Sequence, residues 1–99
     1  MKAPQLSSAT EQRLTLPFAP DAQEEARTVL LSECGTNIPG WKSAGRERLH
    51  FAALKLSAGK LDKLQRAVNI AKIDFRDVLM AAGFGEPTDH ISWFPEQKW

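Results

Sequence analysis

The chain has 99 residues, of which 42% are hydrophobic and 25% are charged, and its formal net charge at pH 7 is +1. This length is typical of one domain with one core, and so small a net charge argues against a polyelectrolyte that binds its partners through bulk charge. The charge is uneven along the chain, however, with −2 over residues 1–40, +6 over residues 41–73 and −3 over residues 74–99.

The first elements are a polar tail and a short apolar stretch. Residues 1–12 are predicted to be a mobile N-terminal tail, followed by a single helical domain over residues 13–99. Leu14, Leu16 and Phe18 alternate with other residues, which is the period of a strand. The proline between the last two lacks a backbone donor, so this stretch is predicted to be an extended arm or an edge strand.

Two helices are predicted next. The first opens at Asp21, which forms a capping-box pattern with Glu24, and it ends at Gly35 as a left-handed cap residue. The second covers about Ser43–Ser57 and carries apolar residues on two sides. A helix with two apolar sides is buried from two directions, which predicts a central position.

Two further helices complete the prediction. The third covers Leu61–Ala71, and the fourth begins at Asp74 as its N-cap and ends at Gly83. Ile73 and Val78 occupy the two positions of a hydrophobic staple. The predicted fold class is therefore all-α: a compact four-helix domain with an extended N-terminal arm and an irregular, aromatic C-terminal tail.

The aromatic tail is the first candidate for function. Tryptophan is costly to leave in water and is enriched at interface hot spots, although Trp93 and Phe94 could instead fold back over a small core. Together with the arm, the tail suggests a non-enzymatic protein-interaction module, of which a homodimer is one form. The predicted partner-binding residues are Leu14, Leu16, Phe18, Trp93, Phe94 and Trp99.

The basic middle of the chain is the alternative candidate. Its charges are spread around the second and third helices, as on an ordinary solvated surface, but they could also bind phosphates weakly. On this alternative the protein is an accessory nucleic-acid-binding protein. The residues involved would be Arg46, Arg48, Lys55, Lys63 and Arg66.

Catalytic and metal-binding patterns are weak. Cys34 could pair with His50 or His90 as nucleophile and base, but it lies near the C-terminal end of a predicted helix, where the dipole disfavours a thiolate. One cysteine and two histidines far apart in sequence fit no metal-binding spacing. We therefore expect no enzymatic activity, no cofactor and no metal.

The cellular setting follows from two further patterns. Cys34 is the only cysteine, so no internal disulfide forms, and a reducing compartment is the simpler interpretation. Residues 1–12 contain no apolar core of a signal peptide, and no apolar run approaches the roughly 18 residues of a membrane span. We expect a cytoplasmic protein.

Residues 60–84, with the sequence KLDKLQRAVNIAKIDFRDVLMAAGF, and the HISWFP stretch that follows resemble a family of small uncharacterised proteobacterial proteins. In that family a leucine-rich helix leads into an Asp-aromatic-Arg-Asp helix that is closed by Ala-Ala-Gly-Phe. The resemblance covers about residues 29–95. It implies a helical fold in a bacterial cytoplasm, and because its motif concerns packing and capping, it assigns no functional residue.

Overall fold

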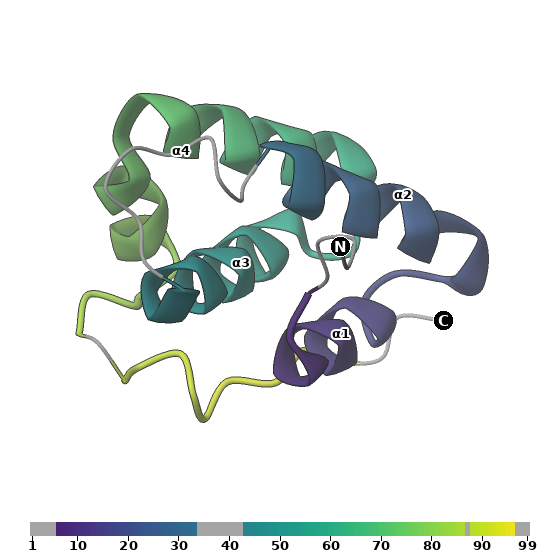
Figure 1. Ribbon diagram of the computed structural model, residues 1–99, viewed down its shortest axis with the longest axis horizontal. Coiled ribbons are helices and arrows are strands. Elements are labelled where there is room, and N and C mark those ends of the chain that lie inside the picture. Colours follow the sequence, from purple (N-terminus) through teal and green to yellow (C-terminus); the bar gives the residue numbers. More distant parts are fainter. Residues whose placement is uncertain (1–5, 34–42, 87, 97–99) are drawn as a thin grey trace.

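The computed structural model describes residues 6–33, 43–86 and 88–96, apart from the side chains of residues 33 and 43–46. These residues form four helices and no strand, which confirms the predicted all-α fold (Figure 1). The helices are α1 (Ser8–Thr15), α2 (Pro20–Glu33), α3 (Ser43–Ser57) and α4 (Leu61–Ala81).

The four helices pack in a ring around one core. α3 packs most extensively against α4 and also contacts α1, while α2 contacts α4 and α1. The burial of α3 on both of its apolar sides confirms its predicted central position. All six side chains from Leu49 to Leu54 are buried, and five of them are hydrophobic: Leu49, Phe51, Ala52, Ala53 and Leu54. The last segment of the chain leaves α4 and runs back to α1 without regular structure (Figure 1).

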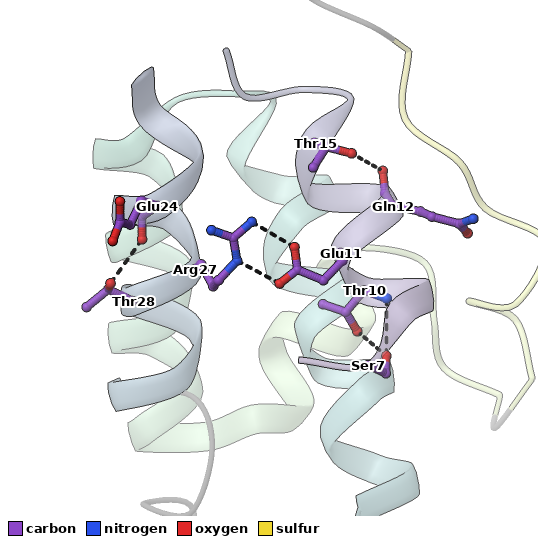
Figure 2. A network of polar contacts seen from close by, with 8 residues as sticks. All are labelled: Ser7, Thr10, Glu11, Gln12, Thr15, Glu24, Arg27 and Thr28. Carbon is purple, nitrogen blue, oxygen red and sulfur yellow. Dashed lines mark hydrogen bonds and ion pairs between the residues drawn. The ribbon is translucent and has the colours of Figure 1, made fainter. Parts of the chain in front are cut away.

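The N-terminal segment differs from the prediction. Residues 8–12 belong to α1 and not to a mobile tail, and the predicted extended arm is helical up to Thr15. Ser7 caps the helix, because its side chain accepts a hydrogen bond from the backbone N–H of Thr10 at 3.1 Å (Figure 2). Leu14 and Phe18 are fully buried, and they are four residues apart, which is helical spacing and not the period of a strand.

α2 begins one residue earlier than predicted. Pro20 is its first residue, a position that proline favours because the missing N–H would be unpaired there in any case. Asp21 therefore lies within the first turn and does not cap the helix. Further along α2, the Arg27 guanidinium forms two hydrogen bonds to the carboxylate of Glu11, at 2.6 and 2.8 Å, and joins α2 to α1 (Figure 2).

The predicted third and fourth helices are the two parts of α4. Its backbone leaves helical geometry at Asp74, with φ −152° and ψ 101°, and Figure 1 shows the bend. The Asp74 side chain accepts a hydrogen bond from the Arg76 N–H at 3.0 Å, so it caps the second part as predicted. The predicted staple does not form, because Ile73 is 89% exposed while Val78 is buried.

The C-terminal end of α4 is a Schellman motif. Gly83 has a positive φ of 79°, as predicted for the terminating glycine. Its N–H bonds to the carbonyl of Met80 at 3.1 Å, and the N–H of Phe84 bonds to the carbonyl of Leu79 at 2.8 Å. The buried Phe84 ring is thereby placed at the start of the C-terminal segment.

The cap at the bend is testable by substitution. Asp74→Ala removes the acceptor for the Arg76 N–H, and we expect it to lower the free energy of unfolding by about 1 kcal/mol, the usual value of an N-cap. Asp74→Asn keeps a capping oxygen and should change stability by much less. Urea unfolding compares the two variants; equal losses would mean that the charge of Asp74, and not its cap, stabilises the bend.

Candidate interaction surface

The C-terminal segment is attached to the helices by the side chain of Arg13. Its Nε donates to the carbonyl of Trp93 at 2.9 Å and its Nη2 to the carbonyl of Ile91 at 3.0 Å. Its Nη1 donates to the carbonyl of Ala9, one turn earlier in α1, also at 3.0 Å. One guanidinium thus joins α1 to two carbonyls that lie about eighty residues further along the chain.

Arg13 also lies between two aromatic rings. Its Cζ is 4.3 Å from the centroid of Phe51 on α3 and 3.8 Å from that of Phe94 in the C-terminal segment. Arg13 is only 4% exposed. Burial lowers its pKa, and the negative charge of Glu47 partly opposes this. The carbonyls and the negative ring faces compensate for the loss of hydration of this buried charge.

His90 lies in the same region, among aromatic side chains. Its ring centroid is 5.1 Å from that of Phe51 and 6.3 Å from that of Phe84, both in edge-on geometry. Trp93 packs against the same two phenylalanine rings. These four residues form what we call the aromatic cage: Phe51, Phe84, His90 and Trp93.

His90 is unusual because part of its polar ring is buried without a partner. The residue is 7% exposed, and its Nδ1 atom is buried with no hydrogen-bond partner. Burial lowers the pKa of His90 below its ordinary value of 6.5. The cations Arg48 and Arg13 lower it further, while the carboxylates of Glu47 and Asp89 act in the opposite direction.

Two cations of α3 hold the C-terminal end of α4. Arg48 donates from Nε to the carbonyl of Phe84 at 2.9 Å, with a second bond from Nη2. Lys55 donates to the carbonyl of Ala82 at 2.8 Å and lies 4.9 Å from the centroid of the Phe84 ring. Positive groups are favourable at this end, where the last carbonyls of the helix have no partner within it.

These contacts change the interpretation of the predicted nucleic-acid-binding residues. Arg48 and Lys55 are engaged with carbonyl groups of the protein and do not form a free basic face with the others. Lys63 and Arg66 are exposed on α4. The side chain of Arg46 lies outside the described residues.

The predicted partner-binding residues are also dispersed. Leu14 and Phe18 are fully buried in the core and therefore offer no surface to a partner. Leu16 is half-buried, as is Trp93 within the aromatic cage. Phe94 is 57% exposed, although Arg13 covers one face of its ring. The last predicted residue, Trp99, lies outside the described residues.

A surface that the sequence analysis missed lies on α4. Ile73 is 89% exposed, Met80 is 70% exposed and Ile70 is partly exposed. Ile70 and Ile73 are three residues apart in the first part of α4, which is typical of one side of a helix, whereas Met80 lies in the second part, beyond the bend at Asp74. We call these three residues the exposed α4 stripe. The three-residue spacing of Ile70 and Ile73 can be read from the sequence, but the predicted hydrophobic staple placed Ile73 in a contact with Val78 and not on the surface.

Within the described ranges, no group of three His, Cys, Asp or Glu residues could hold a metal ion. None of the helices found there is both long enough and apolar enough to cross a membrane. No protein-family model matches the chain, and neither the curated proteins nor the solved structures contain a significant match. The resemblance of residues 60–84 to a proteobacterial family therefore stays a prediction.

The contribution of Arg13 can be separated from that of an ordinary ion pair. Arg13→Met removes hydrogen bonds from a buried cation to three carbonyls, and we expect it to lower the free energy of unfolding by roughly 3 kcal/mol. Arg27→Met removes the half-exposed pair with Glu11 and should cost no more than about 1 kcal/mol. Chemical unfolding of both variants measures the difference.

Hydrogen exchange locates the effect of the Arg13 substitution. In Arg13→Met the amide of Trp93, which bonds to the carbonyl of His90, should lose protection, while amides in the middle of α3 keep theirs. If the two arginine variants lose equal stability and the Trp93 amide stays protected, Arg13 does not hold the C-terminal segment.

Proposed function

We propose that the protein is a non-enzymatic interaction module that self-associates through the exposed α4 stripe. The observation that carries this proposal is the exposure of Ile73, at 89%, on the same helix as Met80, at 70%. Single exposed apolar residues are common on protein surfaces. Several large ones on one element are more typical of a contact surface.

The charges around the stripe favour a second copy of the chain as the partner. Before Ile73, α4 has one carboxylate, Asp62, and three cations, Lys63, Arg66 and Lys72. After it come two carboxylates, Asp74 and Asp77, and one cation, Arg76, which pairs with Asp74 at 3.5 Å. In a two-fold contact the same patch meets itself in the opposite direction. An axis near Ile73 would therefore bring the basic part of one α4 beside the acidic part of the other.

Self-association through the stripe predicts that one substitution on it weakens dimerisation. Ile73→Lys places a charge at the centre of the contact, and it should weaken dimerisation at least tenfold, equivalent to about 1.4 kcal/mol. Because the side chain is almost fully exposed, the change should alter the stability of the monomer by less than about 0.5 kcal/mol. Sedimentation velocity over a wide protein concentration range measures the dissociation constant.

Ile91→Lys is the matched control. Ile91 is 58% exposed but belongs to the C-terminal segment and not to α4, so its substitution should leave dimerisation unchanged. Wild-type protein that stays monomeric at every concentration would contradict the second copy as partner. Equal weakening by both substitutions would mean that association depends on general surface hydrophobicity.

A nucleic-acid-binding role is the competing outcome, and it would rest on Lys63 and Arg66. Two phosphate contacts on duplex DNA would make log K fall with log salt concentration at a slope of roughly −1.8. Fluorescence anisotropy of a labelled duplex, with wild type and with Lys63→Glu/Arg66→Glu, tests this. Binding with that salt dependence, abolished in the double variant, would replace the interaction module as the leading function.

A further inference from the structure

The C-terminal segment is built as a separable cover. Its backbone hydrogen bonds are local: the N–H groups of Ile91 and Trp93 bond to the carbonyls of Thr88 and His90 at 3.2 and 3.1 Å. The connection that precedes it is exposed at Gly85 and Glu86. Among the described residues, its attachment to the helices includes the Arg13 hydrogen bonds, the contact of Arg13 with the Phe94 ring, and ring contacts with Phe51 and Phe84.

His90 is the residue of this cover that ordinary packing does not explain. Buried polar atoms without a partner are rare in proteins, yet Nδ1 of His90 is buried and unpartnered among the rings of the aromatic cage. Phenylalanine would fill the same place at no polar cost. A titratable ring at this point makes the attachment of the segment sensitive to pH, because the charge of the ring depends on pH.

The charges around His90 come from each element packed against it. α1 contributes Arg13, α3 contributes Glu47 and Arg48, and the C-terminal segment contributes Asp89. Lys55 of α3 lies against the Phe84 ring on the α4 side of the cage. A protonated His90 would therefore be a further buried cation beside Arg13, with which it shares the Phe51 ring.

We propose that residues 88–94 form a pH-sensitive cover, which stays docked on Phe51 and Phe84 while His90 is neutral and is released when its ring takes up a proton. The step is a proton equilibrium and needs no other reactant. Release would uncover the two phenylalanine rings and would break the hydrogen bonds from Arg13 to Ile91 and Trp93. This inference concerns contacts within one chain and does not rest on the proposed self-association.

The direction of the pH dependence follows from linkage. In the released segment His90 has its ordinary pKa, and burial lowers the pKa in the docked state. Between these two values the released state binds more protons, so docking weakens as the pH falls. Docking is strongest above about pH 6.5, and it is progressively lost from there down to the lowered pKa.

The first test is a proton NMR titration of the wild-type protein. We expect the His90 ring protons to titrate with a midpoint below 6.5, and the amides of Ser92 and Trp93 to shift with the same midpoint. The protection factor of the Trp93 amide, corrected for the intrinsic effect of pH on exchange, should fall over the same pH range. The ring protons of His50, the other histidine in the chain, which is buried in α3, are followed in the same experiment.

Several outcomes would overturn the proposal. A His90 midpoint at or above the ordinary value would mean that the aromatic rings stabilise the imidazolium, as in a cation–π cage. Segment amides that do not move during the His90 titration would show that the cover stays docked in both charge states. A transition that follows the titration of His50 instead would assign the switch to another part of the molecule.

Two variants complete the test. His90→Phe fills the cage without a titratable group, so the segment should stay docked and the Trp93 amide protected across the whole pH range. His50→Gln retains His90 and should retain the transition. A transition that persists in His90→Phe would contradict the proposal. If that variant fails to dock at neutral pH, the supporting result is a transition that occurs both in the wild type and in His50→Gln.

Discussion

The guanidinium of Arg13 is the contact on which the closure of this fold depends. It joins α1, the Phe51 ring of α3 and two carbonyls of the C-terminal segment, Ile91 and Trp93, through a single buried side chain. Placing a cation at 4% exposure is costly unless its donors and its charge are compensated. The compensation comes from backbone carbonyls and ring faces. The buried charge of Arg13 therefore needs the C-terminal segment in place, and the segment needs Arg13 to hold it.

The basic middle of the chain acts by the same principle. Arg48 and Lys55 do not pair with the acidic ends but with carbonyls at the C-terminal end of α4, where the helix dipole is negative. This fixes the direction in which the chain leaves α4 and places Phe84 beneath the C-terminal segment. The ion pair of Arg27 and Glu11 joins α1 and α2 without any contribution from the middle. Arg13, Arg48 and Lys55 therefore act in the same way, because each positions backbone carbonyls of another part of the chain.

Local signals predicted the helices where capping and apolar spacing agree. Ser43–Ser57 has its predicted bounds, and the bend of α4 falls at Asp74 because a capping side chain there competes with a continuous helix. Helix α1 was missed because three apolar residues fit the period of a strand as well as a helical turn, although Ser7 was available as a cap. The Arg13 contacts had no sequence signal, since their acceptors are carbonyls, which every residue carries.

The exposed and the covered apolar surfaces of the molecule meet in one segment. Met80, at one end of the exposed α4 stripe, is four residues from Phe84, which belongs to the aromatic cage. Between them, the carbonyl of Ala82 accepts a hydrogen bond from Lys55 of α3, and the carbonyl of Phe84 itself accepts from Arg48. A partner that shifts the second part of α4 would move one wall of the cage around His90. Linkage is reciprocal: protonation of His90 would then change the affinity for that partner by the same factor by which the partner changes the proton affinity of His90.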